Sequence, residues 1–288
     1  MKKLLILDFD GTLTNAEEEG KNYKLGYLED VALLADLTVE ETMALADQFE
    51  AEILKHADQF GWQFNGKIVA PASVDPYLRI MPISRMIFDH VGAYNDTKER
   101  NRILDRILYK YNYQKTTTAF REGAAQFFAE ASKIEGLETC IVTNSHTKPV
   151  QEKVRALAKE SGHDFDWLVE RVYGSARKYL LDDSFDTLKE AMQISGLNRP
   201  IYLRRKLYYD RIENLQAKFD SSWEDTIVLG DIFELDLCVP ISCGATVGLM
   251  TNDFTPTYEI SFLDQHDRGG VHSNLRAALE WIRSKVSS

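Results

Sequence analysis

Two aspartates separated by one residue follow a short apolar run near the start of the chain. Residues 4–7 read Leu-Leu-Ile-Leu, and Asp8, Asp10 and Gly11 come after them. A continuous apolar run is typical of a buried parallel strand, and ligands in open α/β sheets lie beyond the carboxyl ends of such strands. We therefore expect Asp8 at a strand tip and Asp10 in the loop after it. Because neighbouring carboxylates repel each other unless a cation lies between them, the pattern favours a cation site over a pair of solvated turn aspartates.

A second apolar run ends in the same way, much later in the chain. Residues 226–229 read Thr-Ile-Val-Leu and lead through a glycine to Asp231, with Asp236 five residues further on. Carboxylate oxygens are hard ligands that suit magnesium, which prefers octahedral geometry and keeps several waters. The two acidic strand ends therefore predict a shared cation site.

A third apolar run, residues 137–142, is followed by Thr143, Asn144 and Ser145. The Thr143 hydroxyl and the backbone N–H groups at the start of the next helix could donate hydrogen bonds to a phosphoryl oxygen. The alternative is a turn whose side chains only cap that helix.

Together these segments resemble the haloacid dehalogenase (HAD) superfamily. Residues 8–14, read DFDGTLT, are similar to its first motif, DxDGTLT. The strand that ends at Thr143 resembles the second motif, and residues 230–236 resemble the GDxxExD form of the metal motif. In that superfamily the first Asp of motif one is a nucleophile and the second is a general acid/base.

The resemblance implies magnesium as the cofactor. Asp8 and Asp231 would each supply a carboxylate oxygen, and the backbone carbonyl of Asp10 would supply a third ligand, with phosphate and water completing the set. Asp236 is expected as an outer partner of the metal site. Glu234 is expected to be an exposed residue at a helix start, where its charge favours the helix dipole.

The resemblance also implies a magnesium-dependent phosphatase that hydrolyses a small phosphorylated metabolite through an aspartyl-phosphate at Asp8. Asp10 would protonate the leaving oxygen and then deprotonate the attacking water. Thr143 and Asn144 would bind the phosphate. An acid at position 10 favours phosphate esters, because dehalogenase members lack one there. A phosphomutase of the same superfamily and a non-catalytic HAD-like binding protein remain alternatives.

The superfamily also needs a lysine beside its nucleophile, and two residues compete for this role. Lys206 directly precedes a predicted helix that leads into the Asp231 strand, while Lys178 closely follows a predicted strand at residues 168–173. We prefer Lys206 by a small margin. The two arginines before Lys206 could bind an anion, although such a pair more often forms a solvated face.

The elements that must position these groups alternate between strand and helix after residue 118. This alternation predicts an α/β fold with a doubly wound parallel sheet. Strands are expected at residues 4–7, 137–142, 168–173, 226–229 and 245–250, and helices at residues 122–131, 150–157, 207–219 and 274–286.

Residues 15–117 are predicted to form a mostly helical cap inserted into a core made of residues 1–14 and 118–288. Thr38 and Glu41 have the spacing of a capping box at the start of a helix. Residues 66–82 contain three prolines and are expected to form a structured loop, and no strand is expected within the cap.

The bulk composition limits the partners of the protein. The chain has 288 residues and a formal net charge of 34 − 45 = −11, which argues against nucleic acid or an anionic membrane as the main partner. The three cysteines have no CxxC spacing, and the apolar run after Met1 is too short for a signal peptide. We therefore expect a cytoplasmic protein that acts on a small phosphorylated substrate; its oligomeric state has no signature in the sequence.

Overall fold

The computed structural model describes residues 2–111 and 118–287, and the chain folds into two compact units. The core unit consists of Met1–Asn15, Phe64–Ala70 and Phe120–Ser288, and the inserted unit consists of Ala16–Gln63 and Pro71–Ala119. The sequence-based boundary between residues 117 and 118 stays a prediction, because residue 117 lies outside the described residues.

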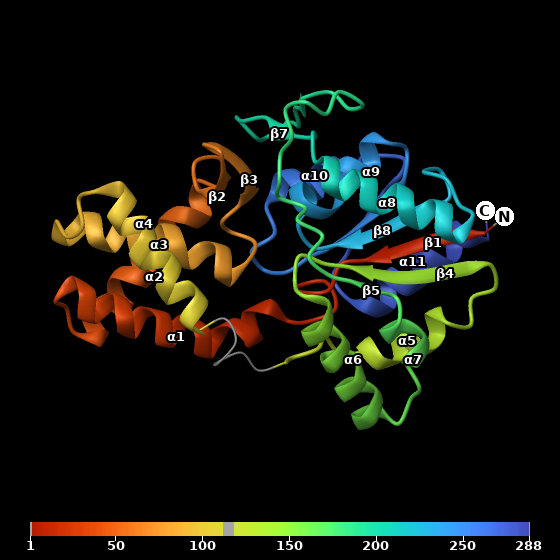
Figure 1. Ribbon diagram of the computed structural model, residues 1–288, viewed down its shortest axis with the longest axis horizontal. Helices are drawn as coiled ribbons and strands as arrows, with labels where there is room; N and C mark the ends of the chain where they lie inside the picture. The colour runs from red at the N-terminus through yellow and green to blue at the C-terminus, as the bar shows by residue number, and fades with distance from the viewer. Residues whose placement is uncertain (1, 112–117, 288) are drawn as a thin grey trace. The chain divides into compact units, whose positions relative to one another are not determined.

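A six-stranded sheet in the order β10-β9-β8-β1-β4-β5 forms the centre of the core unit, and its neighbouring strands are all parallel (Figure 1). The strands are β1 (Lys3–Leu7), β4 (Leu137–Val142), β5 (Val172–Tyr173), β8 (Thr226–Gly230), β9 (Thr246–Met250) and β10 (Gly269–His272). Leu7 of β1 pairs in register with Ile141 of β4 on one side and with Leu229 of β8 on the other. The predicted parallel α/β sheet is confirmed, and the three segments that carry the motifs leave it at one edge.

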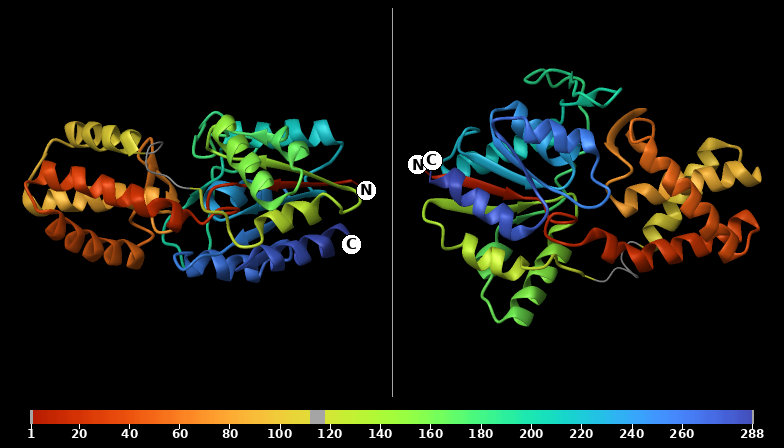
Figure 2. Two further views of the ribbon diagram at one scale, coloured as in Figure 1. Left: turned by 90° about the horizontal axis from the view of Figure 1, so that it is seen from below. Right: turned by 180° about the vertical axis from the view of Figure 1, so that it is seen from behind.

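Helices cover both faces of this sheet. They are α5 (Ala124–Ala131), α6 (Thr147–Ser161), α7 (Asp166–Val169), α8 (Lys206–Phe219), α9 (Cys238–Ser242), α10 (Thr257–Asp264) and α11 (Leu275–Val286), with a π-helical turn η1 (Phe233–Leu237) before α9. Leu5 and Leu7 of β1 belong to one buried cluster with Phe127 of α5, Val154 of α6 and Ile282 of α11. Helix α8 lies on the opposite face from α5 and α11 (Figure 2). Burial of these apolar side chains stabilises β1 at the centre of the unit.

Two parts of the core unit differ from the prediction. The strand expected at residues 168–173 is wrong except for its last two residues, which form β5, and its first two residues belong to α7. The carboxylate of Asp164 accepts a hydrogen bond from the N–H of Asp166 (2.9 Å), and this turn starts a helix instead of a strand. The segment between Lys178 and α8 contains the short antiparallel strands β6 (Ala191–Met192) and β7 (Ile201–Tyr202), which the sequence did not indicate.

The inserted unit is mostly helical. Its helices are α1 (Ala16–Ala35), α2 (Val39–Lys55), α3 (Pro76–Val91) and α4 (Thr97–Tyr111). The capping box at the start of α2 is confirmed, because the Glu41 N–H donates to Thr38 Oγ1 (3.2 Å) and the Thr38 N–H donates to Glu41 Oε2 (2.9 Å). Among residues 2–111 and 118–287, no helix has the length and apolar character needed to cross a lipid bilayer.

The expectation that residues 15–117 contain no strand is wrong. Strands β2 (Gly61–Phe64) and β3 (Lys67–Pro71) pair with each other around Asn65 and Gly66. These two turn residues have φ values of 49° and 75°, the left-handed geometry of a type I′ hairpin turn. Asn-Gly is a strong signal for this turn, so the sequence contained the information.

The loop expected at residues 66–82 is also wrong, because α3 begins inside it. The Asp75 carboxylate accepts hydrogen bonds from the N–H groups of Tyr77 (2.7 Å) and Leu78 (3.1 Å) and so caps the helix. Pro76 occupies the first helical position, where a missing N–H costs nothing, and the helix continues through Pro82.

Candidate active site

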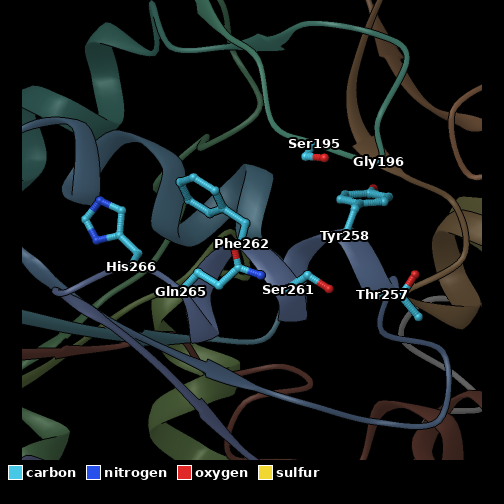
Figure 3. A pocket seen from close by; sticks show the side chains of 8 residues that line it. All are labelled: Ser195, Gly196, Thr257, Tyr258, Ser261, Phe262, Gln265 and His266. Carbon is cyan, nitrogen blue, oxygen red and sulfur yellow. The ribbon is translucent and has the colours of Figure 1, made fainter.

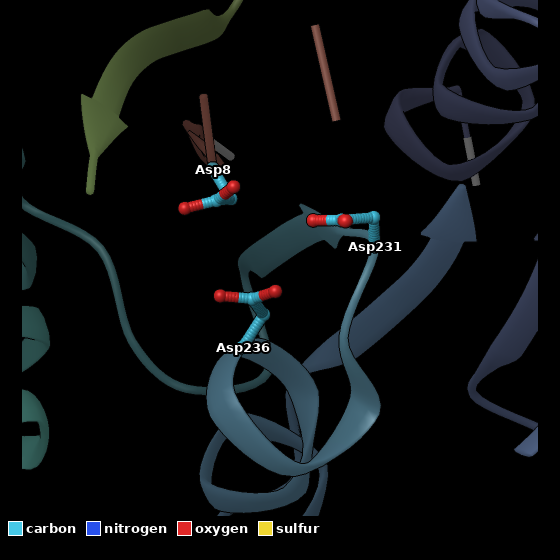
Figure 4. A group of neighbouring side chains, drawn as sticks. All are labelled: Asp8, Asp231 and Asp236. Atoms are coloured by element: carbon cyan, nitrogen blue, oxygen red, sulfur yellow. The ribbon is translucent and has the colours of Figure 1, made fainter. Parts of the chain in front are cut away.

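Three aspartates meet at the carboxyl edge of the sheet. Asp8 follows β1, Asp231 follows β8, and Asp236 lies in η1; Figure 4 shows their carboxylates turned toward a common space. One oxygen of each carboxylate lies within 4.8 Å of the corresponding oxygens of the other two, and all three side chains are buried. We call these three residues the acidic triad.

Glycine is required at two positions where the backbone lies next to the triad. Gly11 has φ 80°, and a Cβ atom there would lie 2.0 Å from Oδ2 of Asp231. A Cβ atom on Gly230 would lie 2.4 Å from the Cβ of Asp236. Since real side-chain contacts are never this short, both glycines allow the backbone to approach the carboxylates closely.

A buried hydroxyl and a guanidinium support the triad. Thr12 Oγ1 lies 3.3 Å from Oδ2 of Asp8 and 3.0 Å from Oδ1 of Asp231, so its proton is shared between two carboxylates. Arg121 donates to the carbonyl oxygen of Gly11 (2.9 Å) and to a second carbonyl (3.1 Å). Burial lowers the pKa of Arg121, while the negative charge of Asp231 opposes that shift. No motif pointed to Arg121.

Lys178 is the lysine that lies at the triad. Its Nζ is 2.6 Å from Oδ1 of Asp8 and 2.7 Å from Oδ1 of Asp236, and the residue is 1% exposed. The preference for Lys206 is therefore wrong. Lys206 is the first residue of α8, its side chain is exposed, and it pairs with Asp210 one helical turn further on.

Burial and ion pairing act against each other in this cluster. Burial raises the pKa of Asp8 to about 8, although the ammonium of Lys178 lowers it in part. Burial alone would lower the pKa of Lys178, but the carboxylates of Asp236 and Asp8 outweigh that effect and raise it. Lys178 is thus held as an ammonium, and the site holds Asp8 as a carboxylate only with difficulty.

Asp10 lies in the loop after β1, as expected from the sequence, and its carboxylate contacts the start of α6. Ser145 donates to Oδ2 of Asp10 (2.6 Å), and Thr143 Oγ1 lies 3.5 Å from the same oxygen. The ammonium of Lys153 lies 3.5 Å from Oδ1. Ser145 and Lys153 were not predicted, although Ser145 directly follows the Thr-Asn pair of the second motif.

The two predicted phosphate-binding residues have different surroundings. Thr143 is buried, and its hydroxyl accepts the N–H of Ser145 (3.1 Å), as in a turn that starts a helix. The side-chain oxygen of Asn144 accepts the backbone N–H of Lys178 (2.8 Å). Asn144 therefore holds the lysine-bearing loop.

The expectation of an exposed Glu234 is wrong. Glu234 is completely buried, and both of its carboxylate oxygens pair with the guanidinium of Arg199 (2.8 and 2.5 Å). Glu259 of α10 is buried nearby, and burial raises its pKa well above the ordinary value, with a further contribution from the charge of Glu234. Glu234 is thus part of an internal ion pair, because Arg199 from the β6–β7 segment reaches it.

A groove of about 490 Å³ lies over α10, outside the triad (Figure 3). Its lining is polar and aromatic, with Ser195 on one side and Tyr258, Ser261, Phe262 and His266 on the other. No residue of the acidic triad lines this groove, so it is separate from the candidate active site.

The acidic triad fits a divalent cation. Three buried carboxylates converge there, and the ammonium of Lys178 offsets only one of their charges. The resulting excess of negative charge adds to burial in raising the pKa of Asp8, and a cation would relieve it. Oxygen donors with room for water are the ligand type that magnesium prefers. Asp8 and Asp231 would hold the ion, while Asp236 already accepts hydrogen bonds from Lys178 and from the N–H of Ile232 (3.1 Å).

Comparison with known proteins shows a likeness in fold and none in sequence. No protein-family model and no curated protein sequence matches the chain. A predicted phosphoglycolate phosphatase from Haemophilus somnus superposes with a TM-score of 0.55 at 15% identity, covering 98% of this chain and 98% of that one. A putative haloacid dehalogenase-like hydrolase from Bacteroides fragilis gives 0.50 at 11% identity, covering 96% of this chain and 100% of that one.

A third structure agrees with these two. A haloacid dehalogenase-like family hydrolase from Streptococcus pneumoniae superposes with a TM-score of 0.50 at 12% identity and covers 98% of both chains. The parallel sheet, the inserted helical unit and these structural neighbours agree with the first-motif resemblance at Asp8. The chain therefore has the fold of the haloacid dehalogenase-like hydrolases.

Proposed function

We propose that this protein is a magnesium-dependent phosphatase that hydrolyses a small phosphorylated metabolite through an aspartyl-phosphate on Asp8. The observation that carries the proposal is the convergence of Asp8, Asp231 and Asp236 around Lys178 at the edge of the sheet. A structural role alone does not explain three buried carboxylates with so little compensating charge, because burying such groups without partners is costly.

In the proposed reaction Asp8 attacks phosphorus in line with the leaving oxygen. A carboxylate nucleophile divides the hydrolysis into two easier steps. Lys178 neutralises Asp8 and the phosphoryl group, and Thr143 contributes a hydroxyl at the neighbouring strand end. Bound magnesium would supply positive charge that makes the approach of the phosphoryl group to Asp8 less costly.

Asp10 is proposed as the general acid and base. It would protonate the leaving oxygen and later take a proton from the water that hydrolyses the acyl phosphate on Asp8, a role typically worth about 10²–10⁴-fold in rate. Its carboxylate is partly exposed and is oriented by the hydroxyl of Ser145. The inserted unit is proposed to act as a cap that excludes water and selects the substrate.

We also propose a cellular compartment and a class of partner for the protein. Cys140, Cys238 and Cys243 are all unpaired, as expected for a protein of the reducing cytoplasm. With a net charge of −11, the expected partner is a small phosphorylated substrate rather than nucleic acid or an anionic membrane.

Hydrolysis of p-nitrophenyl phosphate and of a panel of phosphorylated metabolites tests the proposal, with magnesium and with EDTA. Turnover should require magnesium and should fall to background in Asp8→Asn while the variant stays folded. Lys178→Met and Lys206→Met form a matched pair, and only the first should lose activity. Magnesium-independent turnover, or an active Asp8→Asn, would contradict the mechanism, and a panel without any substrate would favour a binding protein.

A further inference from the structure

The backbone of Lys178 is held on both sides. Its N–H donates to the side-chain oxygen of Asn144 (2.8 Å), and its carbonyl oxygen accepts from Nη1 of Arg205 (2.7 Å). The ammonium of the same residue is held by Asp8 and Asp236. Each polar group of Lys178 therefore has a defined partner.

Arg205 is unusual in how its guanidinium is used. The residue is completely buried, and its donors go to three main-chain carbonyls, those of Lys178 (2.7 Å), Tyr202 (2.9 Å) and Val69 (2.9 Å). Within residues 2–111 and 118–287 no ion pair is formed by Arg205. A buried guanidinium without a carboxylate partner is costly, so the three chain segments that it joins gain a fixed geometry at the expense of stability.

The turn that precedes Lys178 needs such support. Ser175 and Arg177 have φ values of 52° and 50°, in the left-handed region that residues with a Cβ atom avoid. Strained residues of this kind persist only where the surrounding structure holds them. Ser175 and Ala176 donate their N–H groups to the carbonyls of Ser145 (2.7 Å) and Thr143 (2.9 Å), and Arg205 holds the end of the turn at Lys178.

We propose that Arg205 is a positioning residue for Lys178: its hydrogen bond to the Lys178 carbonyl keeps the strained turn closed and the ammonium at Asp8. The guanidinium of Arg205 donates to main-chain carbonyls and not to the acidic triad, so it acts on Lys178 through the backbone. Its consequence for turnover rests on the proposed phosphatase function, but its effect on the turn does not.

Amide hydrogen exchange measured by mass spectrometry tests the effect on the turn without any activity. The variants are Arg205→Met and Arg205→Lys, and the matched control is Arg204→Met, whose guanidinium donates to the carbonyl of Asp183 (2.9 Å). Loss of the hydrogen bond to the Lys178 carbonyl should speed exchange in the peptide 175–181 by about five- to tenfold. Exchange in strand β8 should stay unchanged, and Arg204→Met should resemble the wild-type protein in both peptides.

An unchanged peptide 175–181 would overturn the proposal, as would faster exchange that affects β8 equally, since that indicates general destabilisation. If Arg205→Met does not fold, Arg205→Lys decides, because it keeps the buried charge and loses the forked donor geometry.

Kinetics with p-nitrophenyl phosphate and magnesium add the catalytic readout. A misplaced Lys178 should lower kcat by about 10- to 100-fold with little change in KM. Unchanged kcat in a variant whose turn exchanges faster would separate the turn from catalysis and overturn the positioning role. A wild-type protein without phosphatase activity would instead remove the proposed function, and the exchange experiment would still decide what Arg205 does to the turn.

Discussion

Two buried clusters of charged residues, one in each unit, are built in opposite ways. In the inserted unit a guanidinium lies at the centre: Arg79, 1% exposed, pairs with Glu17 and with Glu50 (3.2 Å), and Lys24 also pairs with Glu50 (2.9 Å). In the core unit the carboxylates of the acidic triad converge on one another. The first arrangement satisfies its own charges, whereas the second leaves a need for a further cation.

The first cluster is therefore a structural ion cluster, whereas the acidic triad is a candidate cation site. Burial raises the pKa of a carboxyl in each cluster, that of Glu17 in the first and, to about 8, that of Asp8 in the triad. The cluster also argues against Arg79 as an anchor for substrate, because its guanidinium already pairs with Glu17 and Glu50 and donates to the carbonyl of Ser73 (3.0 Å). Three substitutions and one pH titration test this difference between the clusters. They follow in order from the largest expected effect to the smallest.

Arg79→Met should be the most damaging to stability. It leaves Glu17 and Glu50 without their central partner, and breaking a buried pair in this way costs about 3–5 kcal/mol. The free energy of unfolding in urea measures the loss. The control Lys21→Met removes an exposed pair with Glu18 and should change stability by no more than about 0.5 kcal/mol. A similarly small effect at Arg79 would show that the first cluster is not structural.

Asp231→Asn should have the opposite effect on the stability of the metal-free protein. Removing one of three converging carboxylates should leave the metal-free protein as stable as the wild type or more so. In the wild-type protein, magnesium at 100 times its Kd should add about 2.7 kcal/mol of stability, and the variant should lose this gain. Thermal unfolding with and without magnesium measures both. A wild-type protein that magnesium does not stabilise would contradict the cation site.

Magnesium affinity should depend on pH through Asp8. Since burial raises its pKa to about 8, Asp8 binds a proton below that pH in the metal-free protein, and magnesium must displace the proton. Affinity should therefore rise from about pH 6 to about pH 8, by at most about tenfold per pH unit, and then level off. Calorimetric titration across this range measures the effect. Asp8→Asn should bind more weakly and without this dependence, and a flat wild-type profile would contradict the assignment.

Thr12→Val should give the smallest effect. It removes the hydroxyl shared by Asp8 and Asp231 without changing the size of the side chain, and one such hydrogen bond contributes about 1 kcal/mol, or about fivefold in magnesium affinity. Thr42→Val is the control, because Thr42 is equally buried and donates to the carbonyl of Thr38 (2.9 Å). Both should lose some stability, and only Thr12→Val should weaken magnesium binding.

The sequence alone predicts that the residues at the strand tips converge, and the reason is physical. Parallel strands place their carboxyl ends at one edge, so apolar runs that end at Asp8, Thr143 and Asp231 bring these residues together whatever lies between them. The hairpin at Asn65 and Gly66 follows from a different and local signal, because an Asn-Gly pair favours a type I′ turn.

The pattern of apolar runs could not decide between Lys178 and Lys206. Both follow plausible elements, and the decision depends on the non-regular turn at Ser175 and Arg177, which has no periodic pattern. The burial of Glu234 could not be predicted for a related reason. Its partner Arg199 comes from a segment whose two-residue strands have no clear sequence pattern. Long-range polar partners of this kind are determined by tertiary packing.

The hydrogen bond from Arg205 to the Val69 carbonyl determines how the inserted unit can be removed without harm to the core unit. Val69 belongs to the short stretch Phe64–Ala70, which groups with the core unit although it lies between two stretches of the inserted unit. Replacing residues 16–119 by a short linker would thus delete an acceptor that a fully buried guanidinium uses, together with the Lys67 partner of Asp183 (3.0 Å). A version truncated in this way would leave an orphaned donor inside the core unit, and a graft that keeps the seven-residue stretch would avoid it.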